Sequence, residues 1–119
     1  MRLELAKYLF DIQQAASALS RFVSGRTWAD YEGNAMLRAA VERQFEIIGE
    51  ALSQLARRDA SLASRIDGYQ RIIAFRNILI HGYADVDNRL VWDIVETRLP
   101  MLRSQVDVLL KSATPPDHP

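Results

Sequence analysis

Apolar residues recur every three or four positions along several stretches of the chain, which is the spacing of a helix with one buried face. The first stretch covers residues 3–23 and ends at Ser24-Gly25, because glycine commonly follows the last turn of a helix. The longest stripe covers residues 35 to about 57, and its apolar members are Leu37, Val41, Phe45, Ile48, Leu52 and Leu55. No alternating strand pattern accompanies these stripes, so the sequence predicts an all-α fold.

The second half of the chain predicts two more helices. Residues 69–80 form one, ending at His81-Gly82, where we expect Gly82 to adopt a left-handed C-cap. Residues 90–111 form the other, with Asp87 as its N-cap and with Pro100 inside it. Proline removes a backbone donor and clashes with the preceding turn, which predicts a kink or two abutting helices.

The segments between these helices are short. Thr27 and Asp30 have the spacing of a capping box, which starts a new helix, and Gly33-Asn34 is read as a turn. Residues 59–68 are polar and are read as a loop with at most one helical turn. The expected architecture is an up-and-down bundle of four to five helices.

Composition restricts the classes of protein that remain. The chain has 119 residues, with 15 basic and 15 acidic side chains and no cysteine. We expect one domain over residues 1–111 and a disordered proline-rich tail over residues 112–119. The missing cysteines exclude disulfides, cysteine-based redox catalysis and cysteine-ligated metal sites. No signal peptide is visible and no apolar run approaches the roughly 20 residues of a membrane span, so we expect a soluble cytoplasmic protein. A net charge of zero argues against a protein that coats nucleic acid but leaves room for a local phosphate site.

Candidate chemistry gathers at the end of the predicted helix 69–80. Of the two histidines, His118 lies in the tail, whereas His81 lies close to Arg76, Asn77 and Tyr83. The negative end of the helix dipole favours an imidazolium, which suits His81 to proton transfer, and a guanidinium suits a phosphate in its transition state. If the chain turns at Gly82, His81 and Tyr83 return toward Arg76. The structural alternative is that His81 and Arg76 only satisfy the helix end.

Two features of the stripe over residues 35–57 have more than one interpretation. Glu42, Glu46 and Glu50 recur every four residues, which indicates a charged face that is solvated or paired with arginine. Gly49 in mid-helix costs roughly 1 kcal/mol relative to alanine. A close helix approach within the bundle or at a dimer seam would explain this glycine, and a tolerated glycine is the alternative.

The Arg-x4-His-x-Tyr pattern of Arg76, His81 and Tyr83, with Asn77 after the arginine, resembles the signature of HepT-like HEPN domains. The segments 40–51 and 91–100 resemble two further helices of that family, and the three occur in the right order. The resemblance covers most of residues 3–110 and implies an all-helical HEPN fold that forms a homodimer.

The resemblance also implies an activity and a partner. HepT-like proteins are metal-independent RNA endonucleases that act as toxins of type VII toxin–antitoxin systems, beside a minimal nucleotidyltransferase antitoxin. By position, Arg76 and His81 would be the catalytic pair, with Asn77 in support and no cofactor. The substrate's 2′-hydroxyl would attack phosphorus and leave a 2′,3′-cyclic phosphate, which requires RNA. The antitoxin would attach AMP to Tyr83 and block the site.

Two other functions remain open from the sequence. The chain is alternatively a non-catalytic subunit that binds nucleotide or substrate for the nucleotidyltransferase, with Arg76 and His81 on a phosphate. It is otherwise a purely structural helical dimer, for which neither RNA nor nucleotide matters. The neutral charge favours these two, whereas the intact Arg76, His81 and Tyr83 favour the ribonuclease.

Overall fold

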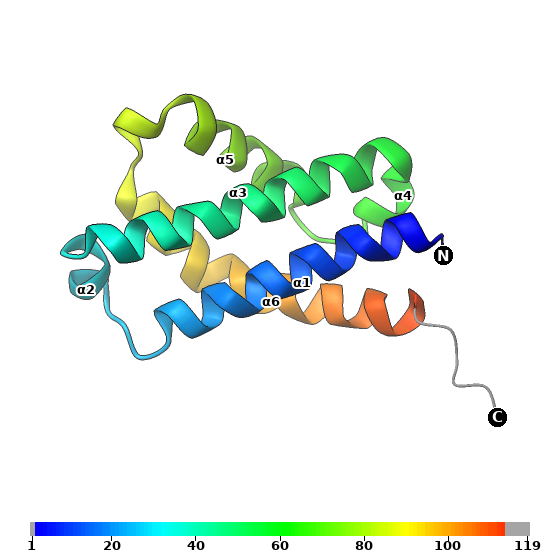
Figure 1. Cartoon of the computed structure of the whole chain (residues 1–119), viewed down its shortest axis with the longest axis horizontal. Helices are drawn as coiled ribbons and strands as arrows, with labels where there is room; N and C mark the ends of the chain where they lie inside the picture. Colours follow the sequence, from blue (N-terminus) through cyan, green and yellow to red (C-terminus); the bar gives the residue numbers. More distant parts are fainter. Residues whose placement is uncertain (1, 114–119) are drawn as a thin grey trace.

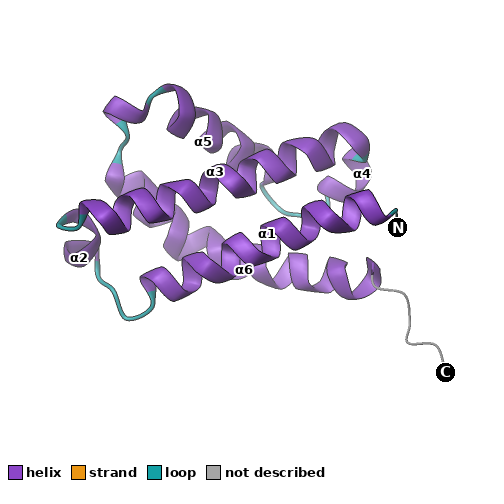
Figure 2. Ribbon diagram, viewed as in Figure 1, coloured by secondary structure: helices purple, strands orange, loops and turns teal. Residues whose placement is uncertain are grey.

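A computed structural model describes residues 2–113, and this part of the chain is built from helices joined by short loops (Figure 2). The elements are α1 (Leu3–Val23), α2 (Trp28–Glu32), α3 (Ala35–Arg58), α4 (Ala60–Ala63), α5 (Tyr69–His81), the 3-10 turn η1 (Tyr83–Asp85) and α6 (Asn88–Ala113). The prediction of an all-α bundle is therefore confirmed, and the four apolar stripes correspond to α1, α3, α5 and α6.

The long helix α3 occupies the middle of the bundle. It packs against α1 on one side and α5 on the other, while α1 also packs against α6 (Figure 1). The apolar stripe foreseen in α3 is buried along its whole length, from Leu37 to Leu55. Burial of these side chains is the main source of stability for a bundle of this kind.

Helix starts follow the capping pattern of the sequence. Thr27 and Asp30 form the expected capping box: the Thr27 hydroxyl accepts from the Asp30 N–H at 3.2 Å, and the Asp30 carboxylate accepts from the Thr27 N–H at 2.9 Å. Hydrogen bonding of the Asp30 carboxylate to Thr27, first of all to its backbone N–H, holds the pKa of Asp30 below its ordinary value. The Asp87 carboxylate accepts from the Arg89 N–H at 3.0 Å, which confirms Asp87 as the cap of α6. Asn34 caps α3 in the same way, by accepting from the Leu37 N–H at 3.0 Å.

The end of α5 differs from the prediction. Gly82 has φ −119° and ψ 30°, so it is not left-handed, and its N–H donates to the Ile78 carbonyl at 2.8 Å. The chain enters η1 at once instead of reversing direction. A Cβ added to Gly82 would stand 3.1 Å from the Ile78 oxygen, so a side chain at this position would be tightly packed.

The last helix is longer than predicted. It is one helix through Pro100 and not two abutting helices, and Figure 1 shows its first turns lying at an angle to the rest. The carbonyl of Glu96, which Pro100 leaves without its helical donor, belongs to an exposed residue, so water can satisfy it. Residues 112 and 113, expected in the disordered tail, belong to this helix. The remainder of that expected tail, residues 114–119, lies outside the described residues.

Among the helices of residues 2–113, none is long and apolar enough to span a membrane.

Candidate active site

Helix α5 carries three of the four residues singled out by the sequence, and the fourth, Tyr83, follows in η1. The buried side chains Ile72, Phe75 and Leu79 hold α5 on α3, and Phe75 meets Phe45 edge-on with ring centroids 5.3 Å apart. Arg76 and Asn77 lie in the second half of α5, His81 is its last residue, and Tyr83 opens η1. The conformation of the Tyr83 side chain lies outside the described part of the structure.

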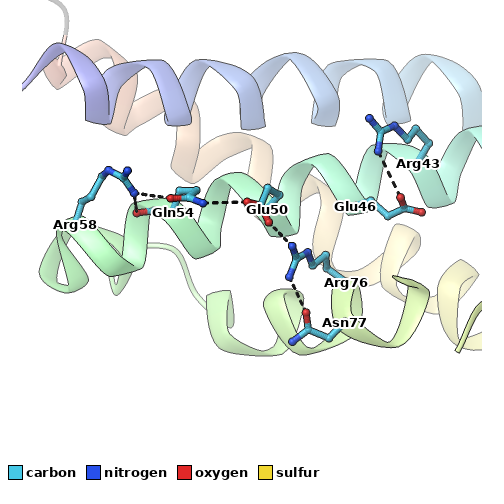
Figure 3. Close-up of polar contacts among 7 residues, drawn as sticks. All are labelled: Arg43, Glu46, Glu50, Gln54, Arg58, Arg76 and Asn77. Carbon is cyan, nitrogen blue, oxygen red and sulfur yellow. Dashed lines mark hydrogen bonds and ion pairs between the residues drawn. The ribbon is translucent and has the colours of Figure 1, made fainter. Parts of the chain in front are cut away.

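Arg76 is held from two directions (Figure 3). One terminal nitrogen, Nη2, forms an ion pair with the Glu50 carboxylate on α3. The other, Nη1, donates to Asn77 Oδ1 at 2.7 Å. The Arg76 side chain is 22% exposed, so its guanidinium is fixed but still reaches solvent.

Gly49 explains how Arg76 comes so close to α3. A Cβ built on Gly49 would stand 2.6 Å from Arg76 Cγ and closer still to Arg76 Cβ. Carbon atoms in contact normally lie about 3.5–4.0 Å apart. Of the interpretations offered for this glycine, the close approach within the bundle is therefore confirmed.

A cleft of about 650 Å³ lies among α1, α3 and α5, with Arg76 in its wall. Its other cations are Lys7, Arg43 and Arg58, and its carboxylates are Asp11, Glu46 and Glu50. Ile80 lines the cleft, which confirms that positions 76 and 80 share a face of α5. Salt bridges join Lys7 to Asp11 and Arg43 to Glu46, so part of the charge is neutralised within the cleft.

His81 lies apart from this cleft. It is exposed and does not line the cleft, and among the described residues no hydrogen bond joins it to Arg76. Five residues along a helix correspond to a rotation of about 140°, which separates the two side chains around α5. The expected turn at Gly82 thus does not bring His81 back to Arg76 within one chain.

Two of the three carboxylates on the acidic face of α3 are paired with arginine, which is one of the two interpretations of this face. Glu46 pairs with Arg43 at 3.5 Å and Glu50 with Arg76. Burial raises the pKa of Glu42, and the negative charge of Glu46 adds to the effect. The sequence placed Glu50 on this face without identifying its partner. The one feature of the sequence that pointed to Glu50 was Gly49, the glycine directly before it.

The chain is thus an all-helical domain with Arg76 in the wall of an open cleft and His81 exposed at the end of the same helix. Comparison with known proteins identifies the class of this domain more closely. The family model "Ribonuclease HepT-like" matches residues 12–109. The chain belongs to this family, and the predicted resemblance is confirmed.

Individual relatives agree with this assignment. "Putative RNase MJ1380" of Methanocaldococcus jannaschii is 31% identical over 106 residues, which cover 89% of this chain and 96% of that protein. "Putative RNase TTE0752" of Caldanaerobacter subterraneus is 32% identical over 104 residues, 87% of this chain and 92% of that protein. "Probable ribonuclease HepT" of Thermococcus cleftensis is 31% identical over 104 residues, 87% of this chain and 94% of that protein. No solved structure matches.

Proposed function

We propose that this protein is the toxin of a type VII toxin–antitoxin system and an endonuclease that cleaves RNA without a metal ion. Membership of the HepT-like ribonuclease family supports the ribonuclease class. The single observation that carries the site assignment is the Arg76 guanidinium, held by Glu50 and Asn77 in the wall of an open cleft. His81, on the same helix and exposed, is the second catalytic residue.

The reaction uses the substrate's own nucleophile. The 2′-hydroxyl loses its proton and attacks the adjacent phosphorus, the bond from phosphorus to the 5′-oxygen breaks, and that oxygen takes up a proton and leaves as a 5′-hydroxyl, so that a 2′,3′-cyclic phosphate forms. His81 transfers a proton in this step, and Arg76 stabilises the negative charge that develops on phosphorus-bound oxygens. The Asn77 carboxamide supports the orientation of Arg76. DNA is not a substrate because it lacks the 2′-hydroxyl.

A second copy of the chain completes the site in this proposal. Arg76 lines the cleft and His81 does not, and the two residues leave α5 in directions about 140° apart, so in this proposal a second copy brings its own Arg76 or His81 to the shared site. Beside this helix, an apolar groove between α5 and α6 contains Ile78 and Leu90, which are 51% and 42% exposed. Exposed apolar residues that line one groove are typical of a protein interface. We therefore place the homodimer contact there.

The dimer is tested by light scattering after size-exclusion chromatography. Ile78→Asp should convert the dimer to a monomer, because a carboxylate would be buried in the interface. Met36→Asp is the matched control, since Met36 is also an exposed apolar residue but lies at the start of α3. A monomeric wild type would refute the proposed contact.

Regulation in this proposal acts on Tyr83, which the resemblance to HepT-like proteins marks as the modified residue and which lies two positions after His81. A nucleotidyltransferase antitoxin that adds AMP to Tyr83 would place a bulky anion close to the catalytic histidine. The added phosphate would repel the phosphate of an RNA strand and would also obstruct it sterically. The partner would thereby switch off cleavage, within a complex that includes the dimer.

Cleavage by substituted proteins tests the proposed site. Arg76→Ala should lose at least a hundredfold in rate, the penalty typical of removing one donor to a developing oxyanion. Arg21→Ala is the matched control, because Arg21 is an exposed arginine in the last turn of α1. If both variants cleave RNA as fast as wild type, Arg76 has no part in the chemistry.

The second candidate is a non-catalytic subunit that binds a nucleotide for the nucleotidyltransferase. The open cleft around Arg76, about 650 Å³ in volume, favours it, because such a cleft would admit a single nucleotide. Calorimetry with a nucleoside monophosphate would then show binding that is lost in Arg76→Ala, with no RNA cleavage by wild type.

A further inference from the structure

Glu50 stands where a residue that orients Arg76 is needed, and the proposed reaction leaves it without a role. It follows Gly49 on α3 and meets the guanidinium from the α3 side of the cleft, opposite Asn77 (Figure 3). Glu50 and Asn77 therefore bind different terminal nitrogens of the planar Arg76 guanidinium.

The stem of Arg76 has little freedom. It lies against Gly49, and its Nε atom is buried without a hydrogen-bond partner among the described residues. Leaving a buried donor unpaired costs about 1–3 kcal/mol, so other contacts must hold this position. Close packing on Gly49 fixes the stem, and the Glu50 carboxylate fixes the charged end.

Glu50 is itself oriented by a row of polar residues along α3. Gln54 Nε2 donates to Glu50 Oε1 at 3.0 Å, which leaves Oε2 for Arg76. Gln54 in turn accepts from Arg58 Nη1 at 2.5 Å, and Arg58 pairs with Glu4 of α1 at 2.5 Å. The row connects α1 to α5 through three successive turns of α3.

The remaining donors of Arg76 suit a phosphate. An arginine has five N–H groups. The Nε–H is buried, and Glu50 and Asn77 each accept from one terminal nitrogen. The second N–H of each terminal nitrogen is left for two oxygens of a phosphate, the geometry in which arginine binds this group best.

We propose that Glu50 is a positioning residue for ribonuclease activity: it orients the Arg76 guanidinium toward the scissile phosphate. This inference rests on the proposed function of Arg76. Stability is a poor explanation for the pair, because the Glu50 side chain is 50% exposed and surface ion pairs contribute about 0–1 kcal/mol. A displacement of 1 Å at a reacting group, by contrast, can cost about a hundredfold in rate.

The experiment compares Glu50→Gln with Glu46→Gln under single-turnover conditions on one RNA substrate. Glu46 is the matched control, since it lies one turn earlier on α3 and pairs with Arg43 at 3.5 Å. Glu50→Gln should lower the rate constant at saturating RNA at least tenfold, with a smaller change in the half-saturating concentration, because orientation matters most in the transition state. Glu46→Gln, which removes a carboxylate of the same cleft that does not contact Arg76, should lower this rate constant clearly less than Glu50→Gln.

Two further measurements separate positioning from a structural role. In an Arg76→Lys background, Glu50→Gln should cause little additional loss, because the residue acts through the guanidinium. The Arg76 Nε–H signal in a ¹H–¹⁵N NMR spectrum should be distinct and protected in wild type and in Glu46→Gln. It should broaden or shift toward the signals of solvent-exposed arginines in Glu50→Gln.

The outcomes are distinguishable. If wild type cleaves RNA and Glu50→Gln matches Glu46→Gln in rate, the positioning role is wrong and the ribonuclease stands. A faster Glu50→Gln would also overturn the inference, by showing that Glu50 competes with phosphate for Arg76. If wild type cleaves no RNA, the proposed function fails, and an unchanged Arg76 signal in Glu50→Gln would then refute the positioning contact by itself.

Discussion

Replacing Gly49 with alanine tests the packing on which the candidate site depends. Two terms of opposite sign decide the result. Alanine is favoured over glycine in a helix interior by about 1 kcal/mol. Against this, the new Cβ would stand 2.6 Å from Arg76 Cγ and closer to Arg76 Cβ. Arg76 Cγ can move by rotation about the Cα–Cβ bond, but Arg76 Cβ is fixed to the backbone, so α3 and α5 must separate.

Overpacking of this kind costs about 1–3 kcal/mol and occasionally more. Because the overlap involves Arg76 Cβ, we expect a cost near the upper end of that range. Gly49→Ala should therefore lower the free energy of unfolding by about 1–2 kcal/mol. At a helical glycine with no close neighbour, the same substitution would raise the free energy of unfolding by about 1 kcal/mol. The sign of the change therefore separates the two cases.

The assay is urea unfolding followed by circular dichroism, at one fixed protein concentration because dimerisation contributes to apparent stability. Arg76→Gly supplies the matched background, since it removes both atoms that meet the new methyl group. In that background Gly49→Ala should become stabilising, which gives a coupling free energy of about 2–3 kcal/mol. If Gly49→Ala is stabilising in both backgrounds, the close contact with Arg76 is refuted.

Two further predictions concern single groups in the bundle. Burial raises the pKa of Glu42, so its ionised form is less favourable in the folded state than in the unfolded state. The stability that the protonated Glu42 side chain contributes is present below about pH 4. It is lost as the pH rises through the raised pKa of Glu42 in the folded protein. Glu42→Gln should therefore raise the free energy of unfolding at pH 7 and leave it unchanged near pH 3. Equal effects at the two pH values would contradict this. Tyr31 is fully buried, and its hydroxyl has no hydrogen-bond partner among the described residues. Tyr31→Phe keeps the ring beside Trp92, at a centroid distance of 5.2 Å, and removes the unpaired hydroxyl. It should raise Tm in thermal unfolding, and a lower Tm would show that the hydroxyl is satisfied in the native protein.

Most of the fold could be predicted from the sequence because the helices are amphipathic and have capping residues. The stripe from Leu37 to Leu55 and the Thr27–Asp30 capping box depend on residues three or four positions apart, and both are present. The predictions that failed concern residues whose conformation depends on their neighbours in the folded chain. Pro100 is tolerated within one helix because it lies on an exposed face, and Gly82 ends α5 without the left-handed conformation that a glycine at a helix end favours.

The candidate site was only partly predictable. Arg76 and Asn77 are neighbours in the sequence, so their hydrogen bond is local, and spacing correctly placed Ile80 on the face of Arg76. The partner of Arg76 could not be found in this way, because Glu50 lies 26 positions away on another helix. Periodicity placed Glu50 among three carboxylates and gave no means of choosing between them. Only the packing of α5 on α3 makes that choice.

Cleavage of a total RNA pool in the presence of EDTA, by wild type and by His81→Ala, is the most direct test of the central claim. Both proteins are expressed without a nucleotidyltransferase, so that Tyr83 carries no AMP. We expect wild type to cleave RNA and to leave 2′,3′-cyclic phosphate ends, and His81→Ala to be inactive. Equal cleavage by His81→Ala would contradict the mechanism, and the absence of cleavage by wild type would contradict the ribonuclease function itself.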